Sequence, residues 1–281
     1  MSKPAFLILA HEDQPLLEIL TGHLLQFGAV YIHLDKKSSI RTDFYPGHSN
    51  LHVYKELSIR WGHWSMVEAT MLLADKAIAD GASYLSYLSG ITLPVTSNEK
   101  FKAFLDEEGD YFEANQITDE EFAKRNRSFQ HRFTRRYIAF RSRRNFVGRL
   151  QRRIMREVFA ITPKLNYKKA LGDVTLCHGI GFWSVTAATY SQAMAATKAR
   201  PSLMKYFKAV EISDETFFQS IFRFITAPKA NTARTYVDWV GSGTPAFLTE
   251  NHLKAIAERD YIFARKFRST DTVVLQKLKW E

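Results

Sequence analysis

The first hundred residues alternate short apolar runs with longer segments in which apolar residues recur at helical spacing. The run at 6–10 is uniformly apolar, which is typical of a buried strand. Leu16, Leu20 and Leu24 follow it at four-residue spacing, which predicts an amphipathic helix that ends before Gly28. Applied along this half, the same reasoning predicts strands at 6–10, 29–34, 51–54, 84–88 and 110–114, and helices at 15–26, 65–79 and 98–107.

This alternation of strands and helices is typical of βαβ units, which build a mostly parallel sheet covered by helices on both faces. The predicted fold class is therefore α/β. Helix starts are indicated by Ser65, which has Glu68 three residues later as in a capping box, and by Asn98.

Polar residues stand just after the predicted strands. In parallel sheets, ligands bind at the carboxyl ends of the strands. The residues in these positions are His11, Asp35, Arg60 and Ser89. They are the first candidates for a ligand site.

The second half of the chain carries weaker patterns. They predict strands at 177–184, 234–239 and 272–275, and helices at 186–199, 214–224 and 249–259. Asp214 and Glu215 fall in the first turn of a predicted helix, where the helix dipole favours acidic residues. Since no repeat or linker divides the chain, we expect one domain over residues 1–281, with an arginine-rich helical insertion at about 118–160.

Composition and motifs exclude several classes of protein. The longest apolar run, Ala5 to Ala10, is far shorter than the roughly 20 residues that span a membrane. It is also too short for the h-region of a signal peptide. A single cysteine, Cys177, favours a reducing compartment and argues against a structural zinc site. The chain also lacks the P-loop, dinucleotide-binding, zinc-protease and G-x-S-x-G motifs. We therefore expect a cytoplasmic protein.

The net charge of +10 is concentrated in one segment. Residues 124–156 contain 13 Lys and Arg and no Asp or Glu, which leaves a net charge of −3 on the rest of the chain. Aromatic and aliphatic residues are interleaved with these arginines, as in an amphipathic helix lying on anionic lipid. One alternative is that this segment binds a lipid-linked or phosphorylated acceptor. Another is that the segment covers the sheet and its arginines are simply solvated. No nucleic-acid module accompanies the segment, so no nucleic-acid partner is expected.

Seven stretches, in the same order along residues 5–267, resemble a known family. They are Phe6-Leu-Ile-Leu-Ala-His11, Ile32-His-Leu-Asp-Lys-Lys-Ser38, Arg60-Trp-Gly-His-Trp-Ser65, Tyr87-Leu-Ser-Gly-Ile-Thr-Leu-Pro94, Ser213-Asp-Glu-Thr-Phe-Phe218, Tyr236-Val-Asp-Trp239 and Phe263-Ala-Arg-Lys-Phe267. The chain resembles the core-2/I-branching β-1,6-N-acetylglucosaminyltransferases, glycosyltransferase family 14, which also includes the peptide O-xylosyltransferases.

This resemblance implies a GT-A-like fold, a UDP-sugar donor and an inverting mechanism. It also implies that no metal is needed, because the family binds the donor diphosphate through basic side chains. The sequence is consistent with this, since it contains no Asp-x-Asp motif. We therefore expect no cofactor besides the donor substrate, and no metal site.

Roles for two groups of residues follow from the resemblance. Glu215 stands where the family places the base that takes the proton from the acceptor hydroxyl; stabilisation of a helix start is the alternative. Lys266 matches a residue that neutralises the departing diphosphate, and Arg265 stands beside it. A second basic residue is expected between 239 and 263, but the loop at 241–249 contains no Lys or Arg.

The remaining candidates line the two substrates. His11 and Asp35 match positions along the uridine, and Arg60 and Ser89 are placed with the donor. Structural roles are the alternatives for His11 and Asp35.

On the acceptor side, Glu113 and Trp239 match family positions, and Trp239 is suited to stack on a sugar ring. Core packing is the alternative for Trp239.

The resulting hypothesis is a metal-independent, inverting transferase that moves a sugar, N-acetylglucosamine by expectation, from UDP to a glycan hydroxyl. The glycan is expected to be bacterial and of the cell envelope, with a lipid-linked acceptor as one form of it. UDP-xylose or UDP-glucuronate are the alternative donors. A non-catalytic basic protein that binds a membrane or nucleic acid is the alternative from another class. A cytoplasmic location, peripheral on the inner face of the membrane, fits the basic segment.

Overall fold

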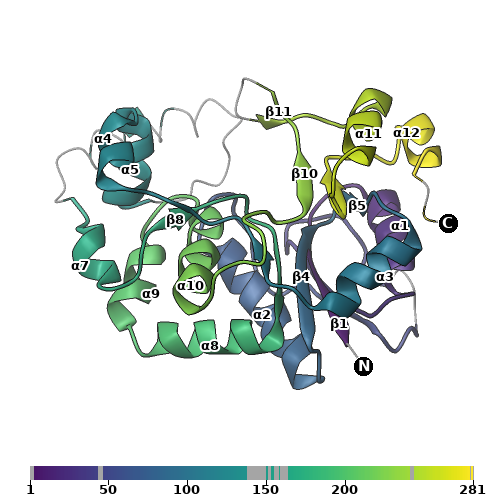
Figure 1. The fold of residues 1–281 in the computed structure, drawn as a ribbon, viewed down its shortest axis with the longest axis horizontal. Helices are drawn as coiled ribbons and strands as arrows, with labels where there is room; N and C mark the ends of the chain where they lie inside the picture. The colour runs from purple at the N-terminus through teal and green to yellow at the C-terminus, as the bar shows by residue number, and fades with distance from the viewer. Residues whose placement is uncertain are drawn as a thin grey trace.

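The computed structural model describes residues 3–43, 47–137, 164–240 and 244–278, together with residues 150, 153, 154, 158 and 280 (Figure 1). A six-stranded sheet is the centre of the fold, in the order β3-β2-β1-β4-β9-β6. Its strands are β1 (Pro4–Ala10), β2 (Ala29–Leu34), β3 (Leu51–Tyr54), β4 (Tyr84–Ser89), β6 (Tyr111–Phe112) and β9 (Trp183–Thr186). The first four strands run parallel, and β9 is antiparallel to both of its neighbours. The predicted α/β class with a mostly parallel sheet is therefore confirmed.

Helices cover both faces of this sheet (Figure 1). The alternating side chains of β1 divide the core, with Leu7 in one buried cluster and Phe6 and Ile8 in the other. Helices α2 (Ser65–Ala79), α8 (Ala187–Lys198) and α10 (Phe217–Ile225) contribute to the first cluster, and α1 (Gln14–Leu24) and α3 (Asn98–Glu107) to the second. Because β1 is buried from both sides, its residues form the continuous apolar run seen in the sequence.

Smaller sheets lie beside the central one. Strands β10 (Thr235–Val237), β13 (Phe263–Arg265) and β5 (Thr92–Pro94) form a three-stranded sheet. Two-stranded pairs are made by β11 (Trp239–Val240) with β12 (Thr244–Pro245), and by β7 (Asn115–Gln116) with β8 (Cys177–His178). The remaining helices are α4 (Asp119–Lys124), α5 (Arg127–Thr134), α7 (Tyr167–Leu171), α9 (Pro201–Phe207), α11 (Glu250–Ala257) and α12 (Thr272–Gln276).

Several local predictions are wrong or incomplete. Residues 272–275, predicted as a strand, lie in helix α12, and the strand predicted at 177–184 is divided into β8 and β9. Ser65 is not a cap: helix α2 follows Trp64, and the Ser65 hydroxyl accepts the backbone N–H of Arg60. Ser97, rather than Asn98, caps α3.

Helices α4 and α5 occupy the start of the predicted arginine-rich insertion. Most of the rest of that insertion lies outside the described residues. In the part of the chain that the structure covers, no helix has both the length and the apolar character required to traverse a bilayer.

Candidate functional site

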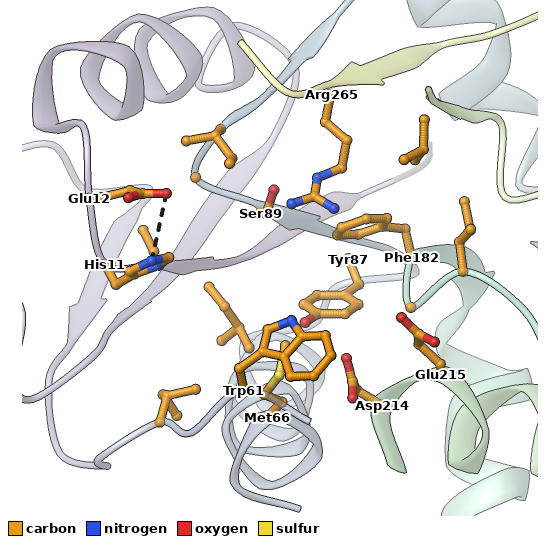
Figure 2. Close-up of a pocket in the computed structure, with 18 of the residues that line it drawn as sticks. His11, Glu12, Trp61, Met66, Tyr87, Ser89, Phe182, Asp214, Glu215 and Arg265 are labelled. Carbon is orange, nitrogen blue, oxygen red and sulfur yellow. Dashed lines mark ion pairs between the residues drawn. The ribbon is translucent and has the colours of Figure 1, made fainter. Parts of the chain in front are cut away.

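A cavity of about 300 Å³ opens at the carboxyl ends of β1, β2 and β4 (Figure 2). Its wall combines these strand ends with side chains from the loop before α2, from the turns at 180–182 and 214–215, and from β10, β11 and β13. The lining residues are Leu9, Ala10, His11, Glu12, Asp35, Ile59, Trp61, Met66, Tyr87, Ser89, Gly90, Ile91, Ile180, Gly181, Phe182, Asp214, Glu215, Val237, Trp239 and Arg265. The cavity lies where ligands bind in sheets of this kind.

Two carboxylates enter the cavity from a short 3₁₀ turn, Ser213–Glu215, and not from the first turn of a longer helix as predicted. Backbone hydrogen bonds fix this turn from two sides. The N–H of Ile212 donates to the carbonyl of Gly62 at 2.8 Å, and the N–H of Gly179 donates to the carbonyl of Glu215 at 3.1 Å. Helix α10 begins after Thr216 with no side-chain cap. These contacts turn the carboxylates toward the cavity instead of toward the helix start.

Burial changes the acidity of this pair. Loss of solvent raises the pKa of Glu215 above the usual carboxyl range, and the neighbouring charge of Asp214 raises it further. Burial likewise raises the pKa of Asp214, whose Oδ1 has no hydrogen-bond partner within the described structure. Two adjacent carboxylates, one buried and one partly buried, resist ionising together, so this turn holds a proton more readily than an exposed Asp-Glu pair.

Arg265 is the cation of the cavity. It ends β13, and its guanidinium points into the cavity toward Ser89 and Tyr87 (Figure 2). The guanidinium carbon lies 4.9 Å from the centre of the Phe182 ring. Burial lowers the pKa of Arg265 to about 10, while electrostatic interactions with Tyr87, Glu215 and Asp214 oppose the decrease. Arg265 therefore remains positively charged at neutral pH.

Tyr87, on β4, lies under the same cavity. Burial raises the pKa of its phenol above the ordinary value, and the Asp214 charge adds to the effect. It therefore stays a neutral hydroxyl at physiological pH, able to donate or accept a hydrogen bond.

Three predicted donor residues, His11, Asp35 and Ser89, line the cavity. Asp35 Oδ1 accepts the backbone N–H groups of Lys37 and Ile59 at 3.1 and 3.2 Å, so this carboxylate also organises the strand-end turns. The Ser89 hydroxyl lies 2.8 Å from that of Thr92. The carboxyl ends of β1, β2 and β4 thus bring these three side chains to one site, as predicted.

Three other predicted residues lie outside the lining, namely Arg60, Lys266 and Glu113. Arg60 precedes the lining residue Trp61. The Lys266 ammonium lies 5.8 Å from the Phe247 ring centre, and burial together with Arg265 lowers the pKa of Lys266.

Glu113 lies just behind the wall formed by Ile180, whose backbone N–H it accepts at 3.4 Å. The negative charge of Glu113 contributes to the raised pKa of Glu215. Next to it, Gly179 approaches so closely that an added Cβ would lie 2.1 Å from the Glu113 carbonyl oxygen. Glycine is therefore required at 179 if the chain after β8 is to approach the Ser213–Glu215 turn, called the carboxylate turn below.

Trp239 lies on the wall of the cavity, with 51% of its surface exposed. It belongs to β11 and is paired with Pro245 of β12. The alternative of core packing does not fit this exposure.

The cavity residues that sequence reasoning missed include Trp61, Tyr87, Phe182 and, as a cavity group, Asp214. Trp61 and Tyr87 stand within stretches that resemble the family, so those stretches carried a signal. Phe182 carried none, because an aromatic residue before a strand is equally typical of core packing.

No group of three or more His, Cys, Asp or Glu side chains is arranged to hold a metal ion within the described ranges. The expected independence from metal stays a prediction.

Comparison with solved structures gives only distant similarity. A 4-diphosphocytidyl-2C-methyl-D-erythritol synthase is 12% identical, with 73% of this chain and 85% of that chain covered and a TM-score of 0.34. A mannose-1-phosphate geranyltransferase from Thermus thermophilus is 13% identical, with 81% and 69% covered and a TM-score of 0.34. A nucleoside-diphosphate-sugar pyrophosphorylase from Vibrio cholerae is 9% identical, with 78% and 88% covered and a TM-score of 0.35.

Comparison with sequences is more informative. No curated protein matches the chain. The family model described as Core-2/I-Branching enzyme matches residues 5–259, which contain nearly the whole of the described fold and most of the cavity wall. The predicted resemblance is thereby confirmed: the chain belongs to the core-2/I-branching enzyme family of glycosyltransferases.

Proposed function

We propose that this protein transfers a sugar from a UDP-sugar to a hydroxyl of a glycan, with inversion at the anomeric carbon and without a metal ion. The observation that carries the proposal is the pairing, in one cavity, of a partly buried carboxylate of raised pKa, Glu215, with a partly buried cation, Arg265. An inverting transfer needs both a base for the acceptor hydroxyl and positive charge for the leaving group.

Glu215 is assigned as the base. Its carboxylate takes the proton of the acceptor hydroxyl while that oxygen forms a bond to the anomeric carbon. The raised pKa supports this role, because a carboxylate that binds a proton more tightly is a stronger base. Asp214 contributes to this raised pKa by keeping negative charge beside Glu215.

Positive side chains are assigned the role of stabilising the negative charge of the leaving group. The bond from the anomeric carbon to the diphosphate oxygen breaks, and its electron pair stays on that oxygen. Arg265, inside the cavity, and Lys266, the next residue, stabilise this charge. Arg265 takes a larger share in this proposal than sequence reasoning gave it, because it lines the cavity and Lys266 does not.

The remaining residues hold the substrates. His11, Asp35 and Ser89 are proposed to contact the donor at the strand ends, together with Arg60, which precedes the lining residue Trp61. Trp239 is proposed to contact the acceptor, with Glu113 behind the wall. We propose UDP-N-acetylglucosamine as the donor, and UDP-xylose and UDP-glucuronate are the donors to compare with it.

Release of UDP from a panel of UDP-sugars, measured in EDTA with and without glycan acceptors, tests this function. Wild-type protein should release UDP with at least one donor. Glu215→Gln keeps the shape of the side chain but cannot accept the proton, so its turnover should fall by at least about two orders of magnitude. Glu120→Gln, an exposed residue on α4, is the matched control.

UDP binding separates this enzyme from a protein that has kept only the fold. Thermal melting in EDTA should show stabilisation by millimolar UDP, because a ligand that binds the native state raises its stability. Glu215→Gln should keep this stabilisation. Absence of both stabilisation and UDP release in the wild type would contradict the proposed function.

An anionic membrane surface is proposed as a further partner. Leu150, Ile154 and Val158 recur at four-residue spacing and are 46%, 53% and 41% exposed. They lie within or just beyond the acid-free segment 124–156. Apolar residues with interleaved basic ones are typical of helices that lie at a membrane surface, and this supports a peripheral position for the protein and a lipid-linked acceptor.

A further inference from the structure

Trp61 has an unusual environment for so large an apolar side chain. It is 55% exposed, yet it forms part of the cavity wall. Trp64, three residues later, is 6% exposed, and Trp183 is 1% exposed. The indole of Trp61 therefore contributes little to the core, and it forms part of the surface that the contents of the cavity would meet.

The backbone around Trp61 is fixed on both sides. The N–H of Arg60 donates to the Ser65 hydroxyl at 2.9 Å, and the N–H of His63 donates to the Arg60 carbonyl at 3.1 Å. Gly62 has a φ of 66°, a conformation that favours glycine, and its carbonyl accepts the N–H of Ile212. The indole is thus carried on a turn with a defined conformation.

One residue connects this turn to the carboxylate turn. The N–H of Ile212 donates to Gly62 at 2.8 Å, and the carbonyl of Ile212 accepts the N–H of Glu215 at 3.2 Å. Two backbone hydrogen bonds on the same residue therefore link the turn that carries Trp61 to the turn that carries Glu215. Figure 2 shows the indole beside Tyr87 and Asp214, on the side of the cavity from which α2 begins.

The cavity presents two kinds of surface. Trp61, Met66 and Ile59 make one part of its wall apolar, whereas Asp214, Glu215 and Arg265 make another part charged. A ligand that fits both has a flat apolar face and polar groups around its edge. A pyranose ring has this shape, because its C–H groups gather on its faces while its hydroxyl groups project from the rim.

We propose that Trp61 is the platform on which a pyranose ring stacks, so that the rim of the ring meets Glu215. This inference rests on the proposed function and names a sugar-binding residue for it. The donor sugar and the acceptor sugar share the relevant chemistry, and the experiment distinguishes them. Trp61 takes no part in proton transfer and no part in holding UDP.

The test compares Trp61→Ala and Trp61→Phe with wild type in three measurements, all in EDTA: UDP affinity by calorimetry, KM for the donor, and KM for the acceptor. Trp61→Ala should leave UDP affinity within about twofold and raise one of the two KM values by about tenfold or more, since tenfold corresponds to about 1.4 kcal/mol of lost contact. Trp61→Phe should recover most of this loss, because it restores an aromatic face. The KM that rises identifies the stacked sugar.

Val273→Ala is the matched control, because Val273 is 54% exposed on α12 and does not line the cavity. It should leave all three values unchanged, and all variants should melt within a few degrees of wild type.

If wild type transfers sugar and Trp61→Ala keeps both KM values, the assignment of Trp61 as the stacking platform is wrong, while the proposed function stands. A loss of UDP affinity in Trp61→Ala would also overturn the proposal, because it would place the nucleotide, not a sugar, on the indole. If wild type neither binds UDP nor releases it from any donor, the proposed function itself fails.

Discussion

The imidazole of His252 joins helix α11 to the carboxylate of Asp238, with 3.0 Å between Nε2 and Oδ2. On the other side of the ring, Nδ1 accepts the backbone N–H of Thr249 at 3.0 Å. Since a backbone N–H can only donate, the neutral ring carries its proton on Nε2 and donates it to Asp238. Asp238 precedes Trp239, so this bond attaches the start of α11 to the strand that carries the exposed indole.

Breaking this attachment should impair the use of the acceptor more than the binding of UDP. Asp238→Ala removes the hydrogen bond, whereas Asp238→Asn keeps an oxygen that accepts from His252. We expect Asp238→Ala to raise the acceptor KM several-fold and to lower the melting temperature by a few degrees, consistent with a bond of about 1 kcal/mol. Asp238→Asn should remain close to wild type in both. Equal acceptor KM values for Asp238→Ala and wild type would show that the bond does not position Trp239.

The rate of transfer should increase with pH as Glu215 loses its proton. Because burial and the Asp214 charge raise the pKa of Glu215, this increase should occur above the pH range of an ordinary carboxyl group. Asp214→Asn removes the neighbouring negative charge, so it should lower the pKa of Glu215 and move the rising limb of kcat/KM to lower pH. A pH-rate profile of each protein measures the shift. A limb that stays in place, or moves to higher pH, would contradict the coupling.

The two adjacent basic residues should differ in their effects. Arg265→Ala removes a cation from the cavity, so UDP affinity and turnover should both decrease, and the pH limb should move to higher pH because Arg265 opposes the raised pKa of Glu215. Lys266→Ala should weaken UDP binding and turnover without moving that limb, since the Lys266 charge does not contribute to the raised pKa of Glu215. Activity of the wild type should persist in EDTA. Activity that requires manganese, with a silent Lys266→Ala variant, would refute the metal-free mechanism.

Binding to lipid should depend on both charge and exposed apolar residues. Vesicles of phosphatidylcholine with phosphatidylglycerol should sediment the protein, and added salt should release it because ions screen the attraction. Replacing Arg143, Arg144, Arg152 and Arg153 by Gln, or Leu150, Ile154 and Val158 by Ser, should each weaken sedimentation. Transfer to a small soluble acceptor should stay near the wild-type rate. Loss of that activity would assign the segment to the active site, and unchanged sedimentation would leave it as a solvated surface.

The elements of the fold that sequence could predict are those whose patterns are long and local. The bounds of β2, β3 and α2 agree with the predicted ranges, because the apolar residues of the two strands are contiguous or alternate and those of the helix recur at helical spacing. Residues 272–275 are Thr-Val-Val-Leu, which favour a strand by propensity, yet they form helix α12. Strand β13 has three residues, too few for any period, although Arg265 stands at its end.

The site was predictable in part for the same reason. The ends of β1, β2 and β4 gave His11, Asp35 and Ser89, because parallel strands bring their carboxyl ends together. The sequence predicts a helix-start role for Asp214, since nothing local distinguishes that role from a place in a cavity. Its actual position depends on Gly62, far earlier in the chain, through the hydrogen bond to Ile212.

Gly179 extends the candidate site beyond the residues that face the cavity. Its only side-chain atom is hydrogen, it does not line the cavity, and it contacts Glu113 on one side and the carbonyl of Glu215 on the other. A methyl group there would separate these two acidic residues from their common support. In a mutational scan scored by activity, position 179 would therefore rank with Glu215, the proposed base, and a search for functional positions limited to reactive side chains would overlook it.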